Sequence, residues 1–351
     1  MNISVNGGIV TLTDFGNKYY TLADTKLFRY NPNKRALEGR LNIPTLEAIE
    51  RVNNGLPQEL RLLKQHFIVQ REAVKAALQE ANPNLIVKCD INAALLKHQI
   101  RGVNAAMLHF DFGKATDRGF AYFFDMGTGK TLTTIALMSA LYNKDAIKRV
   151  LVVCPSSLIG SWAQEINKFA AFDYSVAQLM GDKAKRITAL NELQYGAGLQ
   201  IAIINYESTF RDGLFEALTN FKPDLIVCDE SQRIKNHTAQ QSKTMHNLGR
   251  LAKFRVILSG TPIQNAAIDI FSQYKFLDPS IFGGSFYTFR NCYAVMGGYQ
   301  NYQIIGYRNM PQMTEKIYSP WWFQNPKLQY VVVLGFFIYQ YNISGIIKAP
   351  I

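Results

Sequence analysis

Residues 125–131 have the residue types and the spacing of a loop that binds phosphate groups. They read DMGTGKT, between a strand-like FAYFF and the apolar, helix-like run LTTIALMSAL. Gly127 and Gly129 can adopt backbone conformations closed to other residues and present N–H groups to phosphate oxygens at a helix start. Lys130 can reach the β- and γ-phosphates, and Thr131 can ligate Mg²⁺. The predicted nucleoside triphosphate contacts are Met126, Gly127, Thr128, Gly129, Lys130 and Thr131.

This loop departs from the full P-loop pattern at one position. The complete pattern has a glycine five residues before Gly129, where this chain has Phe124. A glycine turn before an ordinary helix is therefore the alternative interpretation of the segment taken alone. An acidic motif further along the chain favours the phosphate loop.

The strand-like run LIVC, residues 225–228, ends in Asp229 and Glu230. A buried parallel strand delivers its last residues to the edge of the sheet where ligands of open α/β folds bind. Asp229 suits coordination of Mg²⁺, and Glu230 suits activation of the water that attacks the γ-phosphate. The alternative is a solvated acidic turn. The catalytic interpretation requires both carboxylates to converge with Lys130 on one triphosphate–magnesium pocket.

Composition indicates a globular chain with a basic surface. The 351 residues are 48% hydrophobic, enough for one large core and a smaller accessory unit. Lysine and arginine number 38 against 26 acidic residues, a net charge of +12. Such a charge favours a polyanionic partner through counterion release, and a generally basic surface is the alternative.

The cysteines and the N-terminus indicate the compartment. The four cysteines are far apart in the sequence, form no metal-ligand pair, and in two cases end apolar strands. The first residues, MNISVNGGIVTLTD, have no basic start followed by an apolar core, so no secretory signal is expected. We therefore expect a reducing cytoplasm, in a bacterial or phage-infected cell, and no membrane partner.

Alternating periods predict the fold of the larger part. Between residues 120 and 282, the runs FAYFF, VLVVC, IAII, LIVC and RVILS alternate with helix-like stretches such as LTTIALMSALY and SWAQEINKFA. Strands separated by helical crossovers predict a doubly wound α/β fold, with a parallel sheet and helices on both faces.

Residues 1–88 differ in sequence pattern from the larger part and predict a small α+β accessory module. VTLTDFGNKYYTLA predicts a short β-hairpin. The stretch from LEAIERVNN to AALQEA predicts a helix broken near residues 55–57, and residues 82–84 (NPN) predict a linker.

Six segments occur in the order found in superfamily 2 helicases, and they most resemble the Swi/Snf-type branch of DNA translocases. They are LLKHQ, DMGTGKT, LVVCPSSLIGSWAQEINKF, IINYES, the DEAD/DEAH-like DESQRIKN, and LSGTPIQN, continued by FLDPSIFG. Over residues 95–283 the chain therefore resembles the N-terminal RecA-like ATP-binding lobe of that family. The resemblance implies ATP and Mg²⁺ as cofactors and double-stranded DNA as partner.

The resemblance also assigns roles around the nucleotide. Gln99 corresponds to the family's adenine-reading glutamine. Asp229 corresponds to the metal-site acid, while Glu230 and Lys130 are the implied catalytic residues. Gln232 stands where the family usually has histidine or aspartate, although an amide can still bridge the nucleotide site to the next strand.

Further segments are implied to couple nucleotide state to movement along DNA. Ser259, Gly260 and Thr261 correspond to the coupling segment, for which a Ser-Gly-Thr-Pro turn is the alternative interpretation. The residues implied to lie along the DNA backbone are Pro155, Ser156, Ser157, Asn205 and Tyr206. Trp162 is interpreted as a packing residue of the helix that follows.

The six ordered motifs end at residue 283. Residues 285–319 resemble the passage between lobes, and the last residues, 320–351, form an atypical apolar tail without the QxxGRxxR-like arginine motif of a second RecA-like lobe. We expect that lobe to be lost or supplied by another chain. The tail is interpreted as disordered or badly packed, as the product of a truncation or frameshift, or as a membrane helix, for which it is short.

Three functions remain open from the sequence. The favoured one is the ATP-binding lobe of a DNA helicase or translocase that hydrolyses ATP with Mg²⁺ in a DNA-coupled manner. The second is a nucleotide-dependent DNA-binding module with little or no turnover. The third is a P-loop enzyme of another kind, such as a small-molecule kinase, which the LSGTPIQN and CPSSL segments disfavour.

Overall fold

The computed structural model describes residues 1–317, except 7, 26, 112–117 and 212, together with residues 322–324. The chain divides into two compact units, Met1–Ala73 and Val74–Ile351. The boundary falls inside a long helix, α3 (Gln58–Gln79), whereas the sequence prediction ended the accessory module at residue 88. The reason is that Val74 and Leu78, on the last turns of α3, belong to the core of the larger unit.

The smaller unit is an α+β fold with a four-stranded antiparallel sheet in the order β1-β2-β4-β3. Its core is formed by apolar side chains such as Val10, Leu12 and Ile49. The strands are β1 Asn2–Asn6, β2 Ile9–Thr13, β3 Phe28–Asn31 and β4 Ala36–Arg40. The helices are η1 Gly16–Lys18, α1 Tyr19–Asp24, α2 Ile43–Asn53 and the first part of α3.

The predicted hairpin within residues 10–23 is wrong. Its first half is β2, which pairs with β1 and β4, but its second half forms α1. After β2 the chain turns through positive φ angles at Asp14 and Gly16, and the helix that follows buries Leu22. The predicted helix break is confirmed, because α2 ends at Asn53 and α3 begins at Gln58.

The larger unit contains a parallel sheet in the order β13-β5-β10-β9-β6-β8-β7. Helices lie between successive strands of the chain, so the predicted doubly wound α/β fold is confirmed. The strands are β5 Arg118–Phe123, β6 Arg149–Cys154, β7 Tyr174–Gln178, β8 Leu199–Asn205, β9 Leu225–Asp229, β10 Phe254–Leu258 and β13 Trp322–Gln324.

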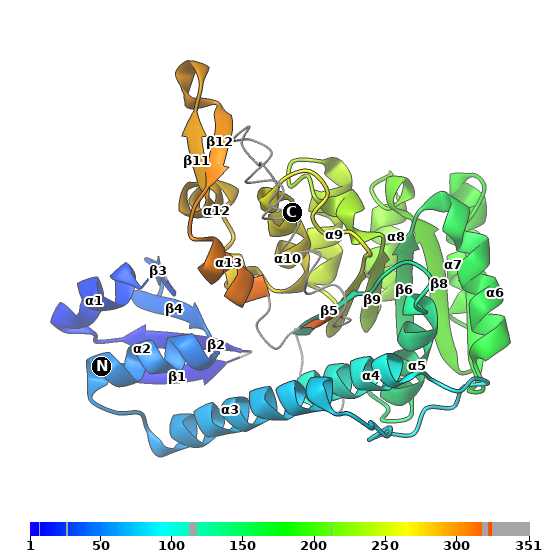
Figure 1. The fold of residues 1–351 in the computed structure, drawn as a ribbon, viewed down its shortest axis with the longest axis horizontal. Helices are drawn as coiled ribbons and strands as arrows, with labels where there is room; N and C mark the ends of the chain where they lie inside the picture. Colours follow the sequence, from blue (N-terminus) through cyan, green and yellow to red (C-terminus); the bar gives the residue numbers. More distant parts are fainter. Residues whose placement is uncertain (7, 26, 112–117, 212, 318–321, 325–351) are drawn as a thin grey trace, which may run out of the picture. The chain divides into compact units, whose positions relative to one another are not determined.

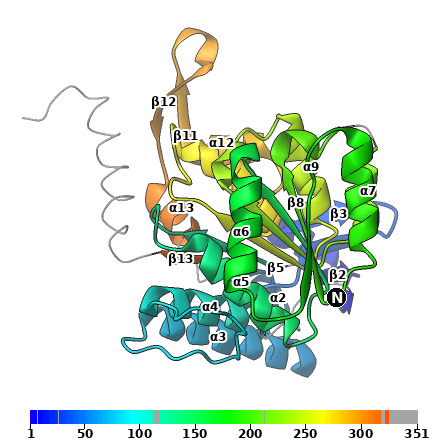
Figure 2. The ribbon, with the colours of Figure 1, turned by 90° about the vertical axis from the view of Figure 1, so that its right-hand side faces the viewer.

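Helices cover both faces of this sheet (Figures 1 and 2). One face packs against α4 (Lys97–His109), α5 (Lys130–Tyr142) and α6 (Ile159–Phe169). The other packs against α7 (Lys183–Leu193), α8 (Leu214–Phe221), α9 (Gln240–Gly249) and α10 (Ile270–Leu277). Successive strand residues alternate between these cores, which is why the strands read as continuous apolar runs.

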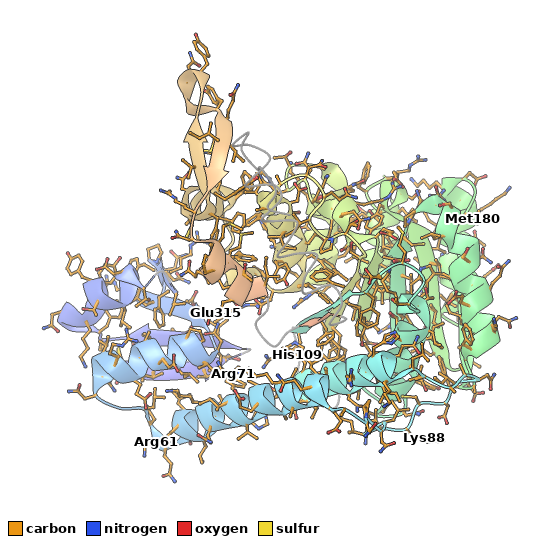
Figure 3. The ribbon with its side chains drawn as sticks, viewed as in Figure 1. Arg61, Arg71, Lys88, His109, Met180 and Glu315 are labelled. Atoms are coloured by element: carbon orange, nitrogen blue, oxygen red, sulfur yellow. The ribbon has the colours of Figure 1, made fainter. Side chains whose placement is uncertain are left out.

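The face of the sheet that packs against α4 includes a buried ionisable side chain, that of His109. His109, at the end of α4 (Figure 3), is 2% exposed and lies against the rings of Phe110 and Phe120. Burial is the main cause that lowers its pKa well below the ordinary value. The side chain therefore acts as part of the apolar packing between α4 and β5.

Residues 285–317 pack onto the α10 side of the larger unit through Phe289, Tyr293, Met313 and Ile317. From residue 279 onward the elements are α11 Pro279–Phe282, α12 Phe286–Tyr293, β11 Ala294–Gly297, η7 Tyr299–Asn301, β12 Gln303–Tyr307 and α13 Met310–Ile317. The short helices that connect earlier elements of the larger unit are η3 Ser156–Leu158, η4 Tyr206–Ser208, η5 Ser231–Ile234 and η6 Ala267–Asp269.

The predicted apolar tail lies largely outside the described residues. Of residues 320–351, only Trp322–Gln324 are described, as strand β13 beside β5. Within the described part of the chain, no helix combines the length and the apolar character that crossing a bilayer requires.

A close backbone approach between β5 and α10 gives a test of this packing. A Cβ added at Gly119 would lie 2.6 Å from the carbonyl oxygen of Leu277. We expect Gly119→Ala to lower the free energy of unfolding by about 1–3 kcal/mol, because backbone atoms cannot rotate away as a side chain can. Urea-induced unfolding followed by circular dichroism measures the change.

The matched control is Gly160→Ala in α6, where an added Cβ meets no atom within 4 Å. Alanine favours helix over glycine by about 0.5–1 kcal/mol, so this variant should be slightly stabilised. Equal loss of stability in the two variants would contradict the close approach at Gly119.

Candidate functional site

All the predicted site segments that follow strands meet at one edge of the sheet. Because the strands are parallel, their C-terminal ends lie at the same edge. In spatial order, the strand ends are β5 with residues 125–129, β10 with 259–261, β9 with 229–230, β6 with 155–157 and β8 with 205–206. Apart from Gln99, which lies on α4, the predicted nucleotide and coupling residues therefore lie at or just after three neighbouring strand ends, and the predicted DNA-facing residues lie at the next two.

The glycine loop has the backbone conformation that the sequence predicted. Gly127 and Gly129 have φ angles of +76° and +84°, and α5 begins at Lys130. An added Cβ at Gly129 would lie 2.2 Å from Nε2 of Gln99. The first turn of α5 leaves backbone N–H groups without partners within the helix, and these can bind an anion. Thr131 is the second residue of this turn and is half-buried.

Gln99 and His98, at the start of α4, contact the backbone of the glycine loop. Gln99 Nε2 donates to the carbonyl oxygen of Thr128 at 3.2 Å, and its Oε1 accepts from the Leu96 N–H at 2.8 Å. His98 Nε2 lies 2.9 Å from the same Thr128 oxygen. Gln99 is 3% exposed, so in this structure its amide positions the loop, and its role as an adenine contact stays a prediction. His98 was not predicted, and its place beside Gln99 in the sequence is the signal that could have found it.

Lys130 reaches back over the loop toward the end of β10. Its Nζ donates to the carbonyl oxygens of Phe124 and Asp125, at 3.1 and 3.3 Å, and would lie 3.8 Å from a Cβ on Gly260. Phe124 occupies the position where the full pattern has glycine. The ring of Phe124 is fully buried in the core and contacts His98 edge-on. Because the ring lies in the core and the backbone carbonyl accepts from Lys130, the bulky residue fits at this position. Met126, by contrast, is 76% exposed.

Asp229 is a carboxylate buried at the end of β9, with 6% exposure. Its Oδ2 accepts from the indole Nε1 of Trp162 at 2.9 Å, and its Oδ1 accepts from the Glu230 N–H at 2.9 Å. Burial is the main cause that raises the pKa of Asp229, while the Trp162 hydrogen bond and the charge of Lys130 lower it. Lys130 Nζ lies near Gly260 at the end of β10, the strand that pairs with β9 and its Asp229.

Glu230 joins the acidic motif to the coupling segment through Gln232. Gln232 Nε2 donates to Glu230 Oε2 at 2.6 Å, and Ser259 Oγ donates to Gln232 Oε1 at 2.8 Å. Ser259 Oγ also accepts from the Thr261 N–H at 3.0 Å. Glu230 has a left-handed backbone with φ +51°, a conformation that costs a residue with a Cβ about 1–3 kcal/mol. The amide that replaces the usual histidine or aspartate therefore does bridge the two strands.

The donors available for a metal suit Mg²⁺. In the described ranges of the chain, no three histidine, cysteine or acidic side chains gather as a metal-binding group. Asp229 would supply one carboxylate and Thr131 one hydroxyl. Mg²⁺ typically takes one or two carboxylates from the protein and fills its other positions with phosphate oxygens and water, so this donor set fits a magnesium–nucleotide complex.

The predicted DNA-facing residues differ in exposure. Ser156 and Ser157 are exposed in η3, whereas Pro155 is buried. Asn205 is half-buried, and its Nδ2 donates to Glu207 Oε2 at 2.9 Å.

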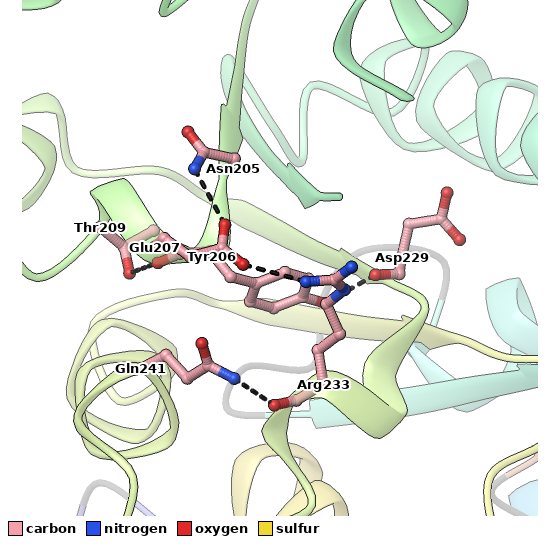
Figure 4. Close-up of polar contacts among 7 residues, drawn as sticks. All are labelled: Asn205, Tyr206, Glu207, Thr209, Asp229, Arg233 and Gln241. Atoms are coloured by element: carbon pink, nitrogen blue, oxygen red, sulfur yellow. Dashed lines mark hydrogen bonds and ion pairs between the residues drawn. The ribbon is translucent and has the colours of Figure 1, made fainter. Parts of the chain in front are cut away.

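Tyr206 is fully buried, and its hydroxyl donates to the Asp229 carbonyl oxygen at 2.7 Å (Figure 4). Arg233 pairs with Glu207 at 2.9 Å and receives a hydrogen bond from Gln241 at its carbonyl oxygen. In this structure the ring of Tyr206 supports β9 and offers no surface to nucleic acid.

Trp162 has a second role that the sequence interpretation missed. Its ring packs in the core, as predicted, but its N–H also bonds to Asp229. A buried indole N–H usually finds a polar partner, so a tryptophan on the helix after a strand end was a signal for such a contact. Its identity as Asp229 required the structure.

Comparison with known proteins gives the family of the chain. The family model for the SNF2-related domain matches residues 58–317. The chain belongs to the SNF2-related family. The mouse (Mus musculus) chromodomain-helicase-DNA-binding protein 1-like is 30% identical over 230 residues, which are 65% of this chain and 24% of that protein. The DNA repair protein rhp54 of Schizosaccharomyces pombe is 35% identical over 185 residues, 49% of this chain and 21% of that protein.

A solved SNF2-family structure shows the same fold. The Sulfolobus solfataricus SWI2/SNF2 ATPase core in complex with dsDNA has a TM-score of 0.53 and 28% identity, covering 69% of this chain and 46% of that one. The Swi/Snf-type resemblance and the RecA-like fold are therefore confirmed. The chain carries an SNF2-related domain, and it spans about a quarter of the mouse relative's length and just under half of the archaeal chain.

The two loop glycines give a test of the loop geometry. Gly129→Ala should destabilise the SNF2 domain more than Gly127→Ala. Both carry the left-handed strain of about 1–2 kcal/mol, but only Gly129 also has Gln99 in the way. Chemical denaturation of both variants measures the difference.

Truncation of Gln99 supplies the control. In a double-mutant cycle, Gln99→Ala should recover the extra loss of Gly129→Ala and leave the loss of Gly127→Ala unchanged. Additive effects at Gly129 and Gln99 would show that the two do not meet.

Proposed function

We propose that the chain is the ATP-binding lobe of a DNA-dependent ATPase of the helicase or translocase type. The observation that carries this proposal is the meeting of the glycine loop and the acids of β9 at one sheet edge. Lys130 reaches toward Gly260 at the end of β10, the strand beside β9, and β9 ends in Asp229, with Glu230 next in the chain. These are the groups that a P-loop ATPase with a DEAD/DEAH-like motif needs.

Each group has a defined task in this proposal. The N–H groups of the glycine loop and of α5 bind the phosphates, and Lys130 leaves its two carbonyl partners to bind the γ-phosphate. Thr131 and Asp229 would hold Mg²⁺, which would neutralise phosphate charge when bound. Glu230 accepts a proton from the attacking water. Gln232 connects Glu230, beside the nucleotide, to Ser259 and Thr261 through the hydrogen bonds described above.

Double-stranded DNA is the proposed partner. The net charge of +12 favours a polyanion, and the structural neighbour was solved in complex with dsDNA. Ser156, Ser157 and Asn205 lie at the sheet edge next to the acids, where hydroxyl and amide groups suit contacts to phosphates. Such contacts position DNA without reading its sequence.

A second RecA-like lobe, in the same polypeptide or another, is proposed to complete the site. The resemblance to Swi/Snf-type enzymes implies arginines that reach the γ-phosphate across a cleft and stabilise the charge of the transition state. One observation favours a second candidate function, a DNA-binding module that holds ATP with little turnover. Glu230 Oε2 is already bonded to Gln232, which competes with the attacking water for that carboxylate.

Substitutions at Lys130 and Glu230 separate nucleotide binding from hydrolysis. Lys130→Ala should weaken binding of Mg–ATP by about 10- to 100-fold, since hydrogen bonds to charged groups contribute about 1.5–3 kcal/mol. Glu230→Gln should keep nucleotide affinity but lower the ATPase rate by about 100- to 10,000-fold. Lys148→Ala, at the opposite edge of the sheet before β6, is the control and should change neither quantity.

The ATPase rate with and without duplex DNA discriminates the two candidate functions. The assay is run on the chain alone and with a polypeptide that carries a matching second lobe. DNA stimulation in either setting supports the ATPase. Binding of ATP and DNA without stimulation in both settings supports the low-turnover module, and a phosphorylated small-molecule product would overturn both.

An added negative charge at the proposed DNA face tests the partner. Ser157→Glu should weaken binding to duplex DNA several-fold, and equally for two unrelated sequences, because phosphate contacts carry no base information. Gln194→Glu adds the same charge at the end of α7, on the opposite edge of the sheet, and should have little effect. Fluorescence anisotropy with labelled duplexes measures both. Equal loss in the two variants would indicate a general charge effect rather than a DNA face.

A further inference from the structure

Asp229 receives hydrogen bonds from the chain segments that follow two other strands. Trp162, on α6 after β6, donates its indole N–H to the carboxylate at 2.9 Å. Tyr206, at the end of β8, donates its hydroxyl to the backbone carbonyl of the same residue at 2.7 Å. Both side chains are buried, at 2% and 0% exposure. One donor thus holds the side chain of Asp229 and the other holds its backbone.

Each donor lies directly behind one of the two proposed DNA-facing segments. The exposed Ser156 and Ser157 form η3, which runs without a break into α6 and so into Trp162. Asn205, the other proposed DNA contact, immediately precedes Tyr206. No flexible linker separates the exposed polar groups from the buried donors in either segment.

Because both rings are buried, a movement of the backbone near Trp162 or Tyr206 also moves the donor that bonds to Asp229. Trp162 belongs to the core on the α6 face of the sheet, and Tyr206 belongs to the core on the opposite face. A close-packed interior leaves such rings little room to move independently of their backbone. An indole also has one N–H and no acceptor, so Trp162 has no second way to satisfy its hydrogen bond.

We propose that Trp162 and Tyr206 are positioning residues that couple DNA binding to Mg–ATP binding through their hydrogen bonds to Asp229. A duplex bound at Ser156, Ser157 and Asn205 fixes η3 and η4, and the two buried donors then fix the carboxylate that holds the metal. The inference rests on the proposed function. It adds a route distinct from the Gln232–Ser259 contacts, which run toward the opposite side of β9.

Coupling of this kind is reciprocal and is therefore measurable by binding alone. If DNA tightens Mg–nucleotide binding by some factor, Mg–nucleotide must tighten DNA binding by the same factor. The test uses the full chain, a fluorescent non-hydrolysable ATP analogue, and a short duplex DNA. The affinity for the analogue is measured in Mg²⁺ and in EDTA, each with and without the duplex.

Two variants remove one hydrogen bond each and keep an aromatic ring, Trp162→Phe and Tyr206→Phe. Trp162→Phe should weaken Mg²⁺-dependent nucleotide binding by about tenfold while affinity in EDTA stays unchanged, since a group that orients a metal ligand typically contributes about 10- to 100-fold in metal affinity. Both variants should bring the coupling factor between DNA and Mg–nucleotide close to one. A general loss of packing would not separate the Mg²⁺ and EDTA affinities in this way.

Tyr122→Phe is the matched control. Tyr122 is fully buried in the same core as Trp162, and its hydroxyl donates to the Gly102 carbonyl oxygen at 3.1 Å rather than to Asp229. This variant should keep both the Mg²⁺ dependence and the coupling factor, and thermal unfolding checks that all three variants fold.

The outcomes distinguish this inference from the proposed function. If the unmodified chain binds Mg–nucleotide and DNA without coupling, or if Trp162→Phe and Tyr206→Phe keep the coupling, the inference is overturned and the proposed function stands. It is also overturned if Tyr122→Phe loses the coupling equally. If the unmodified chain binds neither ligand, the proposed function fails and the inference fails with it.

Discussion

The structure of the site depends on one buried carboxylate, that of Asp229. A charge with 6% exposure is costly unless hydrogen bonds and opposite charges compensate it. Here an indole N–H, a backbone N–H and the charge of Lys130 supply part of that compensation, and burial still raises the pKa. The remaining compensation is what a bound divalent cation would add. The proposed Mg²⁺ would therefore relieve a cost that burial of this carboxylate imposes.

Because of the strand order, this carboxylate lies between two groups of proposed site residues. β9 lies between β10, which leads to Ser259 and the glycine-loop side, and β6, which leads to η3 and α6. The parallel arrangement forces all these strand ends to one edge, so groups proposed to act on nucleotide and groups proposed to contact DNA phosphates become neighbours through β9. No long-range mechanism is needed to connect them, because single side chains such as Trp162 and Gln232 span the distances.

Much of the fold was predictable because its central strands are buried on both faces. β5, β6, β8, β9 and β10 appear in the sequence as continuous apolar runs. The edge strand β7 reads YSVAQ, is only partly buried, and gave no such signal. The α1 segment was mistaken for a strand because its aromatic residues suit both structures, and the turn through Asp14 decided the outcome.

The sequence by itself determined the local chemistry: a glycine loop with positive φ angles before a helix, two acids after an apolar strand, and the motif order of the SNF2 family. These follow from residues close together in the chain, whose conformations depend on their own side chains and immediate neighbours. Only the tertiary structure decided what each side chain contacts. Trp162 and Asp229 are 67 residues apart, and Tyr206 proved to be buried beneath β9 although its neighbours reach the surface. The contacts of Trp162 and Tyr206 with Asp229 form only when the segments that carry them pack against the sheet, and that packing depends on all the core side chains together.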